Sequence, residues 1–91
     1  LATVTLNAGI FTEYFKCDFL LNDTPCLPII DTECNIKIYS INDKLSIKSI
    51  TINGTLIINS ENYLYEYTLQ NFTITKQIEI VVEFYKDSNN Y

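Results

Sequence analysis

The chain has 91 residues, the size of one domain, and 47% of them are hydrophobic. A chain this short buries only about 60–65% of its unfolded surface, so one modest core over residues 1–91 is expected. Its positive charges are scattered lysines, outnumbered by eleven carboxylates. This acidic balance, with no arginine, argues against nucleic acid as a partner. The absence of histidine removes the commonest general acid and base, so no enzyme is expected.

The composition also argues against a membrane span or a metal centre. No apolar run approaches the roughly 20 residues that a membrane-spanning helix needs. The three cysteines Cys17, Cys26 and Cys34 match no zinc motif, and without histidine they leave an incomplete ligand set. Carboxylates around the proline loop could in principle hold calcium together with backbone carbonyls, but their spacing matches no EF-hand or similar loop: Asp18, Asp23, Asp31 and Glu33. We therefore expect no metal and no cofactor.

In the first half of the chain, apolar and polar residues alternate with the period of a strand. Val4 and Leu6 alternate with Thr3 and Thr5 in a first short strand. A second, core strand places one parity inward: Phe15, Cys17, Phe19 and Leu21. The two prolines and the polar residues of 22–28 then predict a loop.

The middle of the chain predicts a strand with a change of face and then a tight turn. Ile36 and Ile38 lie on one parity of a further strand. In the next strand the apolar parity changes, which predicts a bulge near Lys48-Ser49. Asn53-Gly54 is typical of a type I′ hairpin turn, because both residues tolerate positive φ. The hairpin should pair Ile50 and Ile52 with Ile57 and Thr55.

Two more strands complete the pattern. One runs through the tyrosines and ends on Leu69, with one parity expected to be half-buried: Tyr63, Tyr65 and Tyr67. The last places Ile78, Ile80, Val82 and Phe84 inward, leaves Glu79 and Glu83 on a solvated face, and runs into a polar tail from Asp87 to Tyr91. About seven short strands and little or no helix predict an all-β, immunoglobulin-like antiparallel β-sandwich in one domain.

Three groups of residues are candidate sites. Cys26 and Cys34 bracket the proline loop, so they are a candidate disulfide in an oxidising compartment, whereas Cys17 is expected to be a buried free thiol. Of three sequons, Asn53 and Asn71 are candidate glycosylation sites if the protein is secreted. The segment Thr3, Val4, Thr5 and Leu6 is a candidate edge or donor strand.

The order of segments resembles immunoglobulin-like modules in tail, baseplate and fibre proteins of tailed bacteriophages. The likeness spans most of the chain and is carried by a Thr-rich opening strand, an Asp-containing turn before an extended Pro segment, an Ile-Tyr strand, a Tyr-Tyr-Thr strand and a closing apolar-acidic strand: Thr3–Gly9, Asp18–Asp23, Pro28–Asp31, Ile36–Tyr39, Tyr63–Thr68 and Ile78–Phe84. The chain departs from those modules in lacking glycines in the proline loop and before the last strand, and in carrying three cysteines.

The resemblance implies a non-catalytic structural module of a virion, whose partners are protein subunits of the same or a neighbouring type. A second hypothesis is a secreted, pilin-like filament subunit that assembles by donor-strand complementation, outside the cell. The sequons and the candidate disulfide favour this version. A third is a cell-surface adhesin that binds a glycan through its tyrosines, with Tyr65 as the residue to test.

Overall fold

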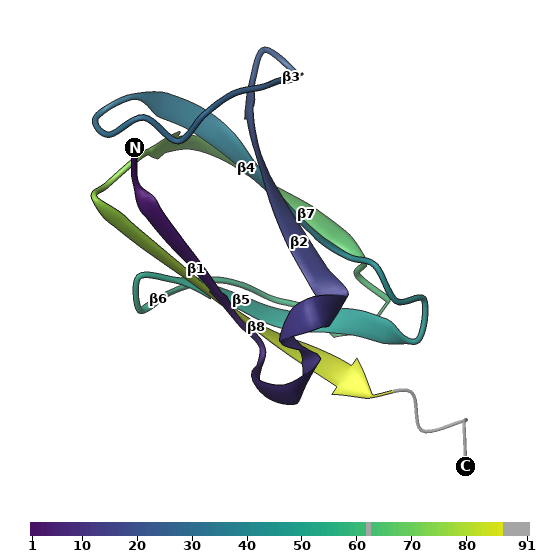
Figure 1. The fold of residues 1–91 in the computed structure, drawn as a ribbon. Coiled ribbons are helices and arrows are strands. Elements are labelled where there is room, and N and C mark those ends of the chain that lie inside the picture. Colours follow the sequence, from purple (N-terminus) through teal and green to yellow (C-terminus); the bar gives the residue numbers. More distant parts are fainter. Residues whose placement is uncertain (62, 87–91) are drawn as a thin grey trace.

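Two sheets packed face to face form the protein, which we describe from a computed structural model over residues 1–61 and 63–86 (Figure 1). The predicted polar tail from Asp87 to Tyr91 lies outside the described residues. The elements in chain order are β1 (Thr3–Asn7), the 3₁₀ helix η1 (Gly9–Tyr14), β2 (Phe15–Leu21), β3 (Thr24–Pro25), β4 (Glu33–Ser40), β5 (Leu45–Ile52), β6 (Thr55–Asn59), β7 (Glu66–Thr73) and β8 (Gln77–Lys86).

The strand order is β1-β8-β5-β6 in one sheet and β3-β2-β4-β7 in the other. Neighbouring strands are antiparallel except β1 and β8, which run parallel with Thr3 opposite Gln77. Each of the hairpins β2–β4 and β5–β6 stays within one sheet, and the chain crosses between sheets elsewhere. The predicted all-β sandwich is confirmed, and the strand beyond the expected seven is the two-residue β3.

Isoleucine dominates the core between the sheets. The fully buried isoleucines come from three strands and one loop: Ile36, Ile38, Ile47, Ile50, Ile74, Ile78 and Ile80. Burying such a side chain contributes about 1.5–3 kcal/mol, so these residues supply much of the stability of a small domain. The expected inward parities of β4 and β8 are confirmed. Ile74, which precedes β8 in a loop, was not predicted from the alternation.

The bulge in β5 is confirmed. Its register against β8 shifts between Ile47 and Ser49. On either side of the shift Ile47 and Ile50 are both fully buried, although their parities differ. The extra residue turns the second half of the strand over, so both apolar sets reach the same core.

The Asn53-Gly54 turn is also confirmed, since both residues have positive φ, at 49° and 81°. The register differs from the prediction in one residue: Ile50 lies opposite Ile58, and Ile57 is an extra, bulged residue of β6. The Asn53 side chain ties the turn to β8. Its amide group donates to Thr75 Oγ1 and Gln77 O, and its Oδ1 accepts from the Glu79 N–H.

Two predicted details are wrong. β7 begins at Glu66, so Tyr63 and Tyr65 precede the strand and are exposed by 76% and 38%. Their alternation with Leu64 mimics a strand, but this segment is an irregular connection in which Tyr63 has a φ of 61°. Leu21, expected inward, is 53% exposed, because β2 ends there and turns into β3 at the margin of the core.

We expect the Asn53→Ala change to lower the free energy of unfolding by about 2 kcal/mol, because it removes three side-chain hydrogen bonds and a residue that tolerates positive φ. Chemical denaturation measures this loss. The matched control is Asn59→Ala, also an exposed asparagine of the β5–β6 hairpin, for which the change should be within about 0.5 kcal/mol. Equal losses in both variants would contradict the bridging role of Asn53.

Candidate functional site

The exposed apolar side chains gather at the two ends of an elongated body of 46 × 23 × 20 Å. The first end contains the start of β1, the loop between β3 and β4 and the start of β8 (Figure 1). The Ala2 N–H donates to Pro28 O there, which joins the start of the chain to the loop. Four large apolar side chains are exposed at this end: Leu1, Leu21, Leu27 and Ile29.

The opposite end contains η1, the β4–β5 connection, the connection from β6 to β7 and the end of β8 (Figure 1). Backbone bonds from the Ile41 N–H to Tyr14 O and from the Ser40 N–H to Tyr65 O hold these segments together. Five large apolar residues are exposed here: Ile10, Tyr14, Ile41, Tyr63 and Tyr65. The most exposed of them is Ile10, at 87%.

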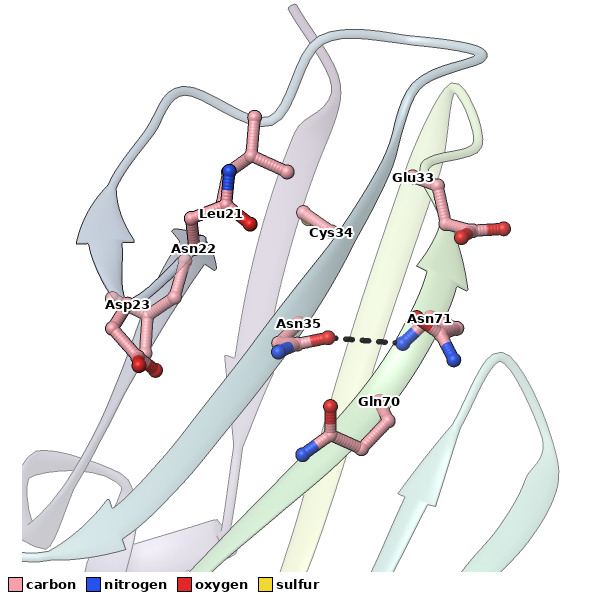
Figure 2. A pocket seen from close by; sticks show the side chains of 9 residues that line it. Leu21, Asn22, Asp23, Glu33, Cys34, Asn35, Gln70 and Asn71 are labelled. Atoms are coloured by element: carbon pink, nitrogen blue, oxygen red, sulfur yellow. Dashed lines mark hydrogen bonds between the residues drawn. The ribbon is translucent and has the colours of Figure 1, made fainter.

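The sheet of β2, β4 and β7 carries a polar hollow of about 480 Å³ beside the first end (Figure 2). Residues from the end of β2, the following turn, the start of β4 and the middle of β7 line it, most of them amides and carboxylates: Leu20, Leu21, Asn22, Asp23, Glu33, Cys34, Asn35, Gln70 and Asn71. Asn35 Oδ1 accepts from the Asn71 N–H at 3.0 Å. This bond satisfies the backbone of β7 where Asn71 has a φ of 56°.

The hollow offers hydrogen bonds from its amides and hydrogen-bond acceptors with negative charge from Asp23 and Glu33. Its amides can donate and accept, but no aromatic ring lines it to stack on a sugar, and no nucleophile–base pair is present among its lining residues. In residues 1–61 and 63–86, no cluster of three or more His, Cys, Asp or Glu side chains is suited to a metal ion. The tyrosines proposed for glycan binding do not lie in it, and the Tyr65 hydroxyl donates to Asp43 O at the opposite end.

The structure brings the three cysteines to one core, and all three are free thiols. Cys34 is buried in β4, and Cys26 packs against the same core just after β3. Burial raises the pKa of Cys34, and the neighbouring Cys26 thiol raises it further. The predicted disulfide pair is therefore adjacent in space.

Cys17 is a thiol sheltered in β2, opposite Ile38. Burial raises the pKa of the Cys17 thiol to about 12, and the charge of Asp18 adds to this shift. A thiol with so high a pKa is a poor nucleophile at neutral pH. Its packing against the core suits the expected structural role.

The remaining candidate residues lie apart from the hollow or at its rim. The Asn53 amide is committed to the hairpin, whereas the exposed Asn71 side chain opens beside the hollow (Figure 2). The segment Thr3–Leu6 lies in β1, at the edge of its sheet, with Val4 and Leu6 packed on the core of its own chain. Glycosylation and strand donation both stay predictions.

The raised pKa of Cys17 predicts a loss of stability in alkali. A thiol whose folded pKa exceeds its unfolded value stabilises fully below about pH 9 and loses that contribution as the pH rises toward 12. At pH 10.5 the loss amounts to about 2 kcal/mol. Between pH 7.5 and 10.5, the free energy of unfolding should thus fall by about that much more in the parent chain than in Cys17→Val. An equal fall in both would contradict it.

The adjacency of Cys26 and Cys34 predicts a disulfide on oxidation. With glutathione disulfide as oxidant, the two thiols form one S–S bond and pass two electrons and two protons to it, which yields two glutathione molecules. In the Cys17→Val background, intact mass should fall by about 2 Da and the free energy of unfolding should rise by about 2–3 kcal/mol. Cys26→Ser should show neither change. A mixed glutathione adduct as the only product in the Cys17→Val chain would disprove the pairing.

The described residues contain no helix long and apolar enough to span a membrane. Comparison with family models, with curated proteins and with solved structures found no match to this chain.

Proposed function

We propose that this domain is a non-catalytic structural module of a virion, in a tail, baseplate, fibre or head-associated protein, and that it acts through contacts between protein subunits. The observation that carries the proposal is the position of the exposed apolar side chains. Of the ten large ones among the described residues, four lie at the first end, five at the opposite end and one, Leu56, on β6. Exposed apolar side chains that gather in one region of a protein mark protein contact sites.

The two ends suit a module that is placed between neighbours along an axis. The start of β1 and the end of β8 lie at opposite ends, because β1 runs parallel to β8. Loops rather than sheet faces form both ends, and loops of a sandwich vary freely on a rigid scaffold. The segment order that resembles phage tail modules supports the virion as the setting.

The secreted filament is the second candidate, and the edge position of β1 favours it. β1 pairs only with β8 in its sheet, and its alternate residues Val4 and Leu6 point at the core. A strand with this pattern can fill the same groove in a neighbouring copy. In the monomer, β1 pairs with β8 of its own chain. Strand donation would begin when β1 leaves this position and pairs with a neighbouring copy.

Fractionation of the producing culture tests the setting. In the virion proposal, peptides of this chain sediment with particles, and the intact mass fits an unglycosylated polypeptide with free thiols. Recovery of the chain in sheared filaments, with glycan on Asn71 or a disulfide between Cys26 and Cys34, would contradict the virion proposal and support the secreted filament. Loss of assembly by a folded chain without residues 1–6 would then establish strand donation.

Single carboxylates at the ends test the contact mechanism. Ile10→Asp and Leu27→Asp each put a charge into an exposed apolar end and should reduce incorporation into particles about tenfold or more, because a buried unpaired charge is costly. Unfolding should change by less than about 0.5 kcal/mol. The matched control, Gln70→Glu, adds a carboxylate at the polar hollow and should assemble normally. If Gln70→Glu alone lost assembly, the subunit contact would lie at the polar hollow and not at the apolar ends.

A further inference from the structure

The open edge of β6 differs from the other sheet edges of the described chain. β6 (Thr55–Asn59) bonds to β5 on one side only, so a row of backbone N–H and C=O groups faces outward (Figure 1). Natural proteins usually protect such edges with charges, proline, covering loops or bulges. From Ser49 to Ser60 the hairpin contains no charged residue and no proline.

The other edges are charged, capped by a further strand or bounded by held residues. β1 (Thr3–Asn7) also carries no charge, but the residues that flank it are held in place, since the Ala2 N–H donates to Pro28 O and the Ala8 N–H to Thr12 Oγ1. The outer side of β2 is capped by β3 and carries Lys16 and Asp18. The edge strand β7 carries Glu66 and is interrupted at Asn71, where φ is 56°. Among the described edges, β1 and β6 carry neither charge nor proline, and of these two only β6 has a large exposed apolar side chain, Leu56.

Leu56 gives the β6 edge an apolar surface as well. It is 60% exposed and lies on the outer face of its sheet. Across the sheet its neighbour is Thr51 of β5, and Thr51 in turn pairs with Val81 of β8. A strand added beside β6 would cover Leu56 and extend this row.

We propose that β6 pairs antiparallel with β6 of a second copy of this chain, about a two-fold axis, to give one continuous sheet through both copies. This deepens the proposed function and rests on it, because it names one of the subunit contacts. The net charge of −5 makes two copies repel each other. At β6 they meet with no charge on either side, and an uncharged strand brings no like charges opposite one another in such a pair.

The pairing is short and therefore weak. Ile57, the bulged residue, interrupts a strand of five residues. A two-strand contact of this size buries well under the roughly 1,200 Å² of a stable complex. The dimer should thus form at about 0.1–1 mM in solution and more readily where an assembly holds copies close together.

Two measurements on the full chain test the pairing. Sedimentation velocity between about 0.02 and 1 mM should show a dimer that grows with concentration. Amide hydrogen exchange over the same range should slow in residues 55–59 and stay constant in β1 and β7. A monomer at all concentrations, with unchanged exchange in β6, would overturn the inference.

Leu56→Lys is the decisive variant. The two-fold axis places both copies of residue 56 on the same face of the joined sheet, so the new charges repel, and the dimer dissociation constant should rise about tenfold or more. Leu27→Lys is the control, because it makes the same change at an exposed residue of the first end and should dimerise as the parent does. Both variants lower the net negative charge equally, so general repulsion cannot explain a difference.

The outcomes separate this inference from the proposed function. If Leu56→Lys dimerises normally while Leu27→Lys does not, the copies associate through the first end, which overturns the β6 pairing and leaves the structural module in place. If the β6 dimer forms but the chain is absent from particles, the pairing stands and the virion setting fails. Thermal unfolding of each variant confirms that the sandwich is intact.

Discussion

The fold depends on one constraint: each sheet has an apolar face that must be covered by the other. Alternation along β4 and β8, and on either side of the bulge in β5, places fully buried isoleucines on one face of each sheet, and these faces cannot remain in water. The constraint explains the β5 bulge, because without the shift at Ile47–Ser49 half of that strand would point its isoleucines outward. Buried Ser46 and Ser49 lie on the same strand, and Ser49 Oγ donates to Glu83.

Beyond the ends of the two sheets, neither sheet covers the apolar residues of the connecting loops. Strands of two to ten residues cannot bury the apolar residues of the loops that join them. In this chain those loops carry leucine, isoleucine and tyrosine rather than only polar residues, so both ends stay apolar. Polar side chains also meet between β5 and β8, where Ser49 Oγ donates to Glu83 Oε1 and the Lys48 ammonium lies 5.8 Å from the centre of the Tyr85 ring. The large exposed apolar side chains of the described residues therefore lie mainly at the two ends.

The sequence predicts correctly those features of the fold that depend only on residues close together in the chain. Alternation over β1, β4 and β8, the Asn53-Gly54 turn and the β5 bulge each depend on neighbouring residues, and each is found as expected. The strand order depends on contacts between distant segments, which alternation does not encode. The polar hollow is of this kind, since it joins residues 20–23, 33–35 and 70–71. Alternation can also predict a strand where there is none, as at Tyr63 and Tyr65. Two periods of alternation are too few to distinguish a strand from an irregular connection.

The ends and the β6 edge point in different directions, which matters for assembly. The proposed contacts at the ends would act along the long axis, whereas the proposed pairing through β6 would join two bodies side by side. Each contact is small, and a chain with a net charge of −5 resists random association. Small contacts become effective when several act together at high local concentration. If the proposed contacts exist, the domain should therefore remain a monomer when dilute and associate where a scaffold has aligned its copies.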